Sequence, residues 1–326
     1  MFANFFYRQL PPWARPSHPI MRYTLGYRSL SRGALLLRLL VAALLVVAVV
    51  AVAYVFTAET LDTSTPGYRA VMYYPLVGAQ LLMQWFALAL TTNIIALERQ
   101  KGTWDSLQIT ERGAGVSVRA RWALVFYRLR WVLLLVFLAR LGFVGLLMQD
   151  MTDFEGRAID VRIIGIEPEV SLEVAVFLLA ALMTAAILQP FVALAFDAAV
   201  GLLVGTVSQQ RSTGILTTVV LIALRGVVTV SALFLGTQIL TANGTTAEII
   251  GMPSAEAWAR ILFFSNQGDT SLRLLDLEVL GNLWGPDLEY GIFIGAAVLL
   301  LVVAQAALAN LMVIYAAWRA GRPGRS

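Results

Sequence analysis

Six long apolar runs constrain this sequence more than any other feature. They lie at about 34–57, 70–97, 122–149, 172–207, 213–240 and 290–318, with polar or charged segments between them. About 20 apolar helical residues span a hydrocarbon core of about 30 Å. The run 172–207 is too long for one straight crossing. We therefore expect it to be tilted, kinked at Pro190 or partly outside the membrane. We expect an all-α integral membrane protein with six transmembrane helices, because a helix satisfies its own backbone groups in lipid.

The composition agrees with a membrane protein and excludes several chemistries. Apolar residues make up 59% of the chain and charged residues 13%, against roughly a quarter charged in soluble domains. The absence of cysteine and the single histidine, His18, exclude thiol catalysis, disulfides and a His/Cys metal site. The net charge of +4 comes from arginines that flank the apolar runs. Anionic lipid, rather than nucleic acid, is therefore the expected counter-charge.

The charges of the connecting segments predict the orientation of the chain. The arm 1–33 carries five arginines and no acidic residue, and it is too long for a signal peptide. The segment 98–121 and the tail 319–326 are also rich in arginine, whereas 150–172 and 242–289 are rich in acidic residues. The arginine-rich segments are expected inside and the acidic ones outside. This predicts a multi-pass transmembrane domain, 34–318, in the plasma (inner) membrane with both termini cytoplasmic.

Shorter helices are expected at both membrane surfaces. In the arm, Pro19 begins a pattern typical of an interfacial helix that runs to residue 33, and a basic juxtamembrane tail is the alternative. In the second acidic segment, Ser254 can cap a helix with Trp258 and Ile261 on one face. We expect this helix to lie on the outer leaflet or to dip into it.

Two charges inside the apolar runs can be placed by counting residues. Asp197 lies 14 residues before Arg211, and Arg225 lies 14 residues after it, on runs that a tight turn makes antiparallel neighbours. Both side chains are therefore expected at the same depth, roughly 20 Å from that turn, and we predict that they pair. The pair is either a polar element of a substrate or ion path, or a buried clamp between two helices. We favour the clamp, because a matched pair leaves no free charge.

The second apolar run carries the amide side chains of Gln80, Gln84 and Asn93. Amides in lipid usually form hydrogen bonds between helices, with a contribution of about 1 kcal/mol each. The alternative is that they line a translocation path. Arg140, on the third run, is expected to reach Asp150 or the lipid headgroups, and no function is assigned to it.

Enzymatic functions lack the necessary residues, so no catalytic site is expected. An intramembrane serine protease needs a base in the bilayer, and His18 lies in the arm. An aspartyl protease needs two intramembrane aspartates, and Asp197 is the only one in the apolar runs. The only lysine, Lys101, follows Gln100, so the chain holds no P-loop of its own.

The segment 98–111 has the pattern of a short surface helix that another protein binds. Gly102 permits a sharp exit from the preceding helix, Thr103 can cap the next one, and Asp105 suits its dipole. Trp104 and Leu107 then share one face. The alternative is a solvated loop whose tryptophan anchors in the headgroups.

The run Glu98-Arg99-Gln100-Lys101-Gly102-Thr103-Trp104-Asp105-Ser106-Leu107 resembles a stretch between the second and third spans of type-2 ABC export permeases, Glu-Arg-Glu-x-Gly-Thr-Leu-Glu-x-Leu-Leu. The six-span layout, His18-Pro19-Ile20 in the inner arm and the Ser-Gln-Gln-Arg turn at 208–211 are similar to that family too. Gln100 and Trp104 depart from the motif, as do Ile109-Thr110-Glu111 and the long outer segment 150–172.

The resemblance implies the permease subunit of an ATP-driven exporter, which forms the translocation path. It implies a separate ABC ATPase subunit that uses ATP and Mg, with no cofactor bound by this chain, and a second permease copy or sister permease. The residues implied in coupling to the ATPase are Glu98, Arg99, Lys101, Gly102, Thr103, Trp104, Asp105 and Leu107. The alternatives are a secondary transporter or channel that works without an ATPase, and a scaffold subunit of a larger complex.

Overall fold

The computed structural model describes residues 10–19, 21–22, 47–55, 57, 67–93, 98, 100, 113–153, 157–163, 166, 168–207, 211–239, 254–284 and 288–321. Within these ranges the regular structure is helical and no strand occurs. Of the expected inner helix from Pro19 to residue 33, Pro19, Met21 and Arg22 are described and are helical. The rest of that helix and most of the coupling segment lie outside the described residues.

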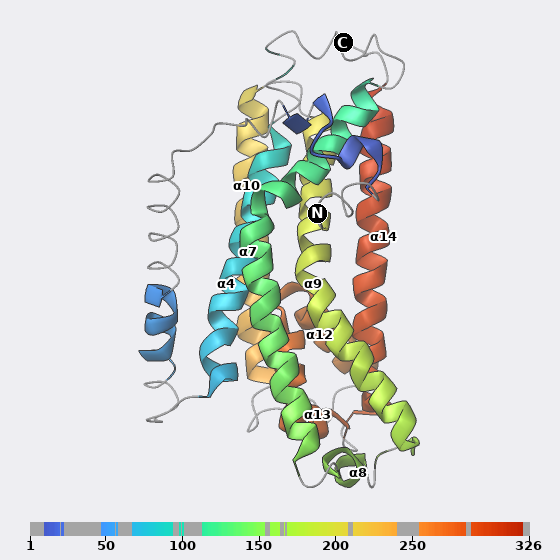
Figure 1. Ribbon diagram of the computed structural model, residues 1–326. Helices are drawn as coiled ribbons and strands as arrows, with labels where there is room; N and C mark the ends of the chain where they lie inside the picture. The colour runs from blue at the N-terminus through green and yellow to red at the C-terminus, as the bar shows by residue number, and fades with distance from the viewer. Residues whose placement is uncertain are drawn as a thin grey trace.

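Five long helices form the bundle in Figure 1: α4 (Tyr68–Thr92), α7 (Gly113–Thr152), α9 (Leu172–Val207), α10 (Arg211–Ile239) and α14 (Ile294–Ala320). Each is long and apolar enough to cross a membrane. Many of their large apolar side chains face outward, as lipid contact requires. The described chain is therefore an all-α, multi-pass membrane protein.

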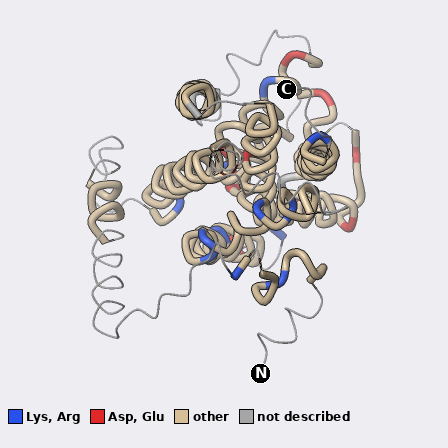
Figure 2. The backbone as a smooth tube through the Cα atoms, turned by 90° about the horizontal axis from the view of Figure 1, so that it is seen from above, with Lys and Arg blue, Asp and Glu red and all other residues tan. Residues whose placement is uncertain are grey.

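The first expected span, 34–57, is described only at residues 47–55 and 57, which are helical. This helical segment stands apart from the bundle in both views (Figures 1 and 2). Its valines at positions 47, 52 and 55 are largely exposed. The bundle itself is therefore built from the five later helices.

Helix α9 lies at the centre of the bundle, where it packs against α14, α4 and α7. Glycines make these contacts close. A Cβ atom on Gly205 would lie 2.7 Å from the carbonyl oxygen of Thr92 in α4, and one on Gly295 in α14 would overlap the carbonyl oxygen of Leu178. Small residues at such crossings let two helix backbones approach each other, which is how helices pack in lipid.

Helix α9 is too long to cross the membrane upright. Its 36 residues correspond to about 54 Å, and Figure 1 shows its lower half inclined to its upper half. Pro190 lies within the helix, as the sequence predicts for a bend. Because proline has no N–H, the carbonyl of Ala186, four residues earlier, has no donor within the helix.

The acidic segment before α14 folds into the bundle. It contains α12 (Ser254–Gln267), the 3-10 turn η3 (Thr270–Leu275) and α13 (Leu277–Trp284). The 3-10 turn η4 (Gly291–Phe293) follows it, directly before α14. The expected helix is present and is described from Ser254, but Ala257 and Ile261 on it are buried, and α12 contacts α10 and α14. Its apolar face therefore packs against protein, and its expected place, on the outer leaflet or dipping into it, stays a prediction. The other acidic segment contributes α8 (Ala158–Ile163), near α13 at the same end.

The opposite end of the bundle holds the 3-10 turn η1 (Pro12–Ala14), which packs against α7. We call this the η1 end, and the other the α8 end. Helix α7 begins at Gly113, not near Trp122 as the apolar run indicates. Its 40 residues correspond to about 60 Å, and its first turns run obliquely across the η1 end (Figure 1). The last part of the segment 98–121 is thus the beginning of α7.

Candidate functional site: a buried polar centre

A tight reversal of the chain lies among the long helices. Helix α12 ends at Gln267, and Gly268 and Asp269 turn the chain into η3. A Cβ atom on Gly268 would lie 2.9 Å from backbone atoms of Ala232 and Leu233 in α10, so only glycine permits this approach. Asp269 has a left-handed backbone, φ 56° and ψ 28°, which aspartate tolerates better than most residues. We call residues 266–269 the tip.

The first charged group that the tip meets is Arg140 of α7. The side chain of Arg140 is 0% exposed and forms an ion pair with Asp269, which is 2% exposed. The guanidinium also donates to Gln80 Oε1 on α4 and to the carbonyl oxygen of Ala186 on α9. That carbonyl is the one that Pro190 leaves without a donor in its own helix. Three acceptors therefore surround this buried cation.

The second group is Arg225 of α10. Its Nε lies 3.3 Å from Asp197 Oδ2 on α9 and 3.3 Å from Gln84 Oε1 on α4. Its Nη1 donates to Gln267 Oε1 of the tip. The structure therefore brings Asp197 and Arg225 together, and it adds two glutamines to the pair.

The two arginines have the same three kinds of neighbour. Each contacts one glutamine of α4, one group of α9 and one side chain of the tip. Gln80 and Gln84 are one helical turn apart, so the two groups are stacked roughly 6 Å apart along α4. The charges of the two arginines balance those of Asp197 and Asp269. We refer to the two groups and the tip together as the polar centre.

The rest of the tip is also bound to the surrounding helices. Gln189 Nε2 of α9 donates to the carbonyl oxygen of Asn266 at 3.0 Å and to its Oδ1 at 2.9 Å. The hydroxyl of Tyr73, on α4, donates to the carbonyl oxygen of Gly268 at 3.4 Å. Every residue of the tip thus has a polar contact with α4, α7, α9 or α10.

The structure corrects two expectations about charge. Arg140 does not reach Asp150, because Asp150 pairs with Arg69 at the start of α4, and Arg69 Nη1 also lies 3.4 Å from Asp276 Oδ2. Asp197 is also not the only buried aspartate among the long helices. Asp269 lies outside the apolar runs, but the tip places it beside Arg140 of α7. The available signal was the dipeptide Gly-Asp, which is typical of a turn but says nothing of depth.

The amides of the second apolar run all have partners on other helices. Gln80 and Gln84 accept from the two arginines, and Asn93 Nδ2 donates to Thr218 Oγ1 of α10 at 3.2 Å. These contacts agree with the interpretation of the three amides as bonds between helices.

Of the residues implied in ATPase coupling, the structure describes one. Glu98 forms an ion pair with Arg121 of α7, whose side chain is 1% exposed. The others lie outside the described residues: Arg99, Lys101, Gly102, Thr103, Trp104, Asp105 and Leu107. The start of the coupling segment is thus tied to α7.

The chemistry of the polar centre is that of a clamp. In the described part of the chain, no cluster of three or more His, Asp or Glu residues is placed to hold a metal ion. Each charge of the polar centre has an opposite charge beside it, so the centre can hold the tip in place. Release of the tip would require Arg140 and Arg225 to replace their tip partners, Asp269 and Gln267, with other acceptors.

No protein family, curated protein or solved structure matches this chain. A functional assignment therefore depends on the geometry of the polar centre and on the resemblance of residues 98–107.

Proposed function

We propose that this chain is the membrane-spanning permease subunit of an ATP-driven exporter of the type-2 ABC family. The observation that carries the proposal is the tip, a short turn held by polar contacts among four long helices. A gate must close the space between helices and yet be able to reopen. Polar contacts suit that task, because an arginine with three acceptors keeps two of them when the third moves away.

Helix α7 provides a route from the ATPase to the gate. It carries Arg121, which pairs with Glu98 at the start of the coupling segment, and Arg140, which pairs with Asp269 of the tip. These arginines are 19 residues apart, which corresponds to roughly 28 Å along a helix. A thrust on residues 98–111 at the η1 end would tilt α7 and move Arg140 against the tip. The ATPase cycle would thereby open and close the gate as a rigid-body switch.

The remaining parts of the proposal follow the family resemblance. The η1 end is cytoplasmic, as are both termini, and the α8 end is external, in the plasma (inner) membrane. The segment 34–57 supplies a sixth span. A second permease, identical or a sister chain, completes the translocation path, and a separate ABC ATPase subunit binds ATP and Mg.

Co-purification tests the proposal directly. The chain is tagged after Ser326, extracted gently from its native membrane and analysed by mass spectrometry. We expect a stoichiometric P-loop ATPase, which is lost in the double variant Trp104→Ala/Leu107→Ala while the permease stays in the membrane. The matched control is Trp131→Ala/Leu138→Ala, which removes the same residue types from the exposed surface of α7. Recovery of the chain without an ATPase, under conditions that preserve other transporters, would contradict the assignment.

One observation favours a secondary transporter or channel as the second candidate. The polar centre contains two buried carboxylates, Asp197 and Asp269, and buried acids among membrane helices often mark ion or proton paths. The purified chain in liposomes distinguishes the candidates. Ion flux without any ATPase, abolished by Asp197→Asn, would replace the exporter assignment.

A further inference from the structure

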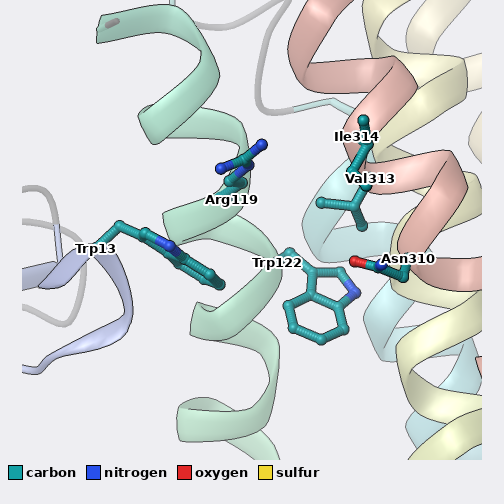
Figure 3. Close-up of a pocket in the computed structure, with 6 residues that line it drawn as sticks. All are labelled: Trp13, Arg119, Trp122, Asn310, Val313 and Ile314. Atoms are coloured by element: carbon teal, nitrogen blue, oxygen red, sulfur yellow. The ribbon is translucent and has the colours of Figure 1, made fainter. Parts of the chain in front are cut away.

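A cavity of about 240 Å³ opens at the η1 end, between η1, α7 and α14. Figure 3 shows the side chains around it, with Trp13 on η1, Arg119 and Trp122 on α7, and Asn310 on α14. Val313 and Ile314 of α14 complete the lining. This cavity is separate from the polar centre.

The polar groups of the cavity suit an anion. Arg119 is exposed, and among the described residues no carboxylate pairs with it or lines the cavity. The amide of Asn310 reaches toward Trp122 from α14 (Figure 3). A guanidinium presents paired donors that match the oxygens of a phosphate, and an amide N–H₂ can add a further donor.

The apolar groups of the cavity suit a membrane surface. Tryptophan is enriched where lipid headgroups meet hydrocarbon, and Trp13 and Trp122 form two sides of the cavity. Ile314 is 45% exposed and faces outward from α14, with Leu311 exposed one turn below it. An acyl chain can therefore follow the outside of α14 away from the cavity.

The size of the cavity selects the part of the ligand that enters it. Pockets that enclose a drug-sized molecule usually measure roughly 300–1,000 Å³, so this smaller cavity has room for a headgroup but not for acyl chains. Other described arginines adjoin η1 or lie in the last turn of α14: Arg15, Arg22 and Arg319. We propose that the cavity binds the phosphate headgroup of an anionic phospholipid, whose acyl chains remain in the bilayer beside α14.

Such a lipid would fasten the N-terminal arm to the bundle. The arm is already held by a hydrogen bond from the hydroxyl of Tyr127, on α7, to the carbonyl oxygen of Ala14 at 2.8 Å. Ala14 and Met21 are buried against Ala120 and Leu124 of α7. A headgroup between Trp13 and Asn310 would add α14 to this contact, so the lipid would join three elements distant in sequence.

Native mass spectrometry of the purified full chain tests the site with defined lipids. The probes are phosphatidylglycerol, which is anionic, and phosphatidylcholine, which has a neutral headgroup, each titrated into the same detergent. We expect one tightly held phosphatidylglycerol in the parent protein. Arg119→Ala should weaken its binding roughly tenfold or more, because a charged hydrogen-bond donor is lost. Arg130→Ala is the matched control, since Arg130 is another exposed arginine of α7, lies over Trp131 and should not affect binding.

A second variant and a competing anion complete the experiment. Asn310→Leu should also weaken binding, and thermal unfolding in the same detergent shows whether each variant is folded. Inorganic phosphate is added as the competitor. Unchanged phosphatidylglycerol binding in folded Arg119→Ala, equal loss in Arg130→Ala, or equal retention of phosphatidylcholine would overturn the proposal. Displacement of the lipid by millimolar inorganic phosphate would also overturn it, because a free anion would then be the ligand.

Discussion

The substitution Asp269→Asn tests the clamp at the polar centre. It keeps the size of the side chain but removes the counter-charge of Arg140, which is 0% exposed. Loss of one partner of a buried ion pair costs about 3–5 kcal/mol. Gln80 and the carbonyl oxygen of Ala186 still accept from the guanidinium, so we expect the lower end of that range, about 3 kcal/mol.

The absence of cysteine gives a local assay for this prediction. Ser265→Cys places one thiol beside the tip, at a side chain that is buried in the parent protein. Thiol labelling in membranes then reports how often the tip leaves the bundle. A loss of about 3 kcal/mol corresponds to a rise of roughly 100-fold in the population of the open form. Labelling of the thiol in the Asp269→Asn background should accelerate by that factor, and thermal unfolding should show the same loss in stability.

Two further variants decide whether charge is the cause. Arg140→Gln/Asp269→Asn removes both charges and should recover at least half of the loss, because no buried charge is then left unpaired. Asp276→Asn is the control, because its carboxylate is 34% exposed and 3.4 Å from Arg69, and it should cost less than about 1 kcal/mol. The reasoning is refuted if the stability of Asp269→Asn lies within about 1 kcal/mol of that of the parent protein. It is also refuted if the double variant is no more stable than the single variant Asp269→Asn.

Two other predictions concern helix packing and the second ion pair. Gly295→Ala should destabilise the bundle by about 1–3 kcal/mol in a thermal melt in detergent, because the added Cβ would overlap the carbonyl oxygen of Leu178. Gly145→Ala is the control. A Cβ at that position has nothing within 4 Å, so this variant should be neutral or slightly stabilising in the same melt. Exchange of Asp197 and Arg225 should restore folded protein lost in either neutral single variant, measured by size-exclusion chromatography; an exchange variant as poorly folded as the singles would contradict the pairing.

The sequence was informative where local geometry fixes a distance. Asp197 and Arg225 are equally far from one tight turn, so their depths follow from residue counts alone. It was uninformative for Arg140 and Asp269, which are 129 residues apart. The acidic composition of 242–289 predicts an external location for that segment. It cannot show that residues 266–269 fold back among the helices.

Helix boundaries illustrate a related limit of hydropathy. The apolar run of α7 begins near Trp122, yet the helix already includes Gly113. Apolarity marks where a chain can enter lipid, whereas a helix begins where its backbone hydrogen bonds do. In contrast, the presence of α12 was readable, because a serine before an apolar periodic stretch is typical of a nearby helix start.

The long separation between Arg140 and Asp269 also has a consequence for biosynthesis. At roughly 5–20 residues per second, the ribosome adds the 129 residues between them in roughly 6–26 seconds. During that interval the membrane holds an arginine whose carboxylate partner has not been made. The helices before α12 can insert, but their final packing must wait for the last quarter of the chain. A chain truncated before Asp269 would therefore expose an uncompensated charge in the bilayer, by which quality control can recognise it.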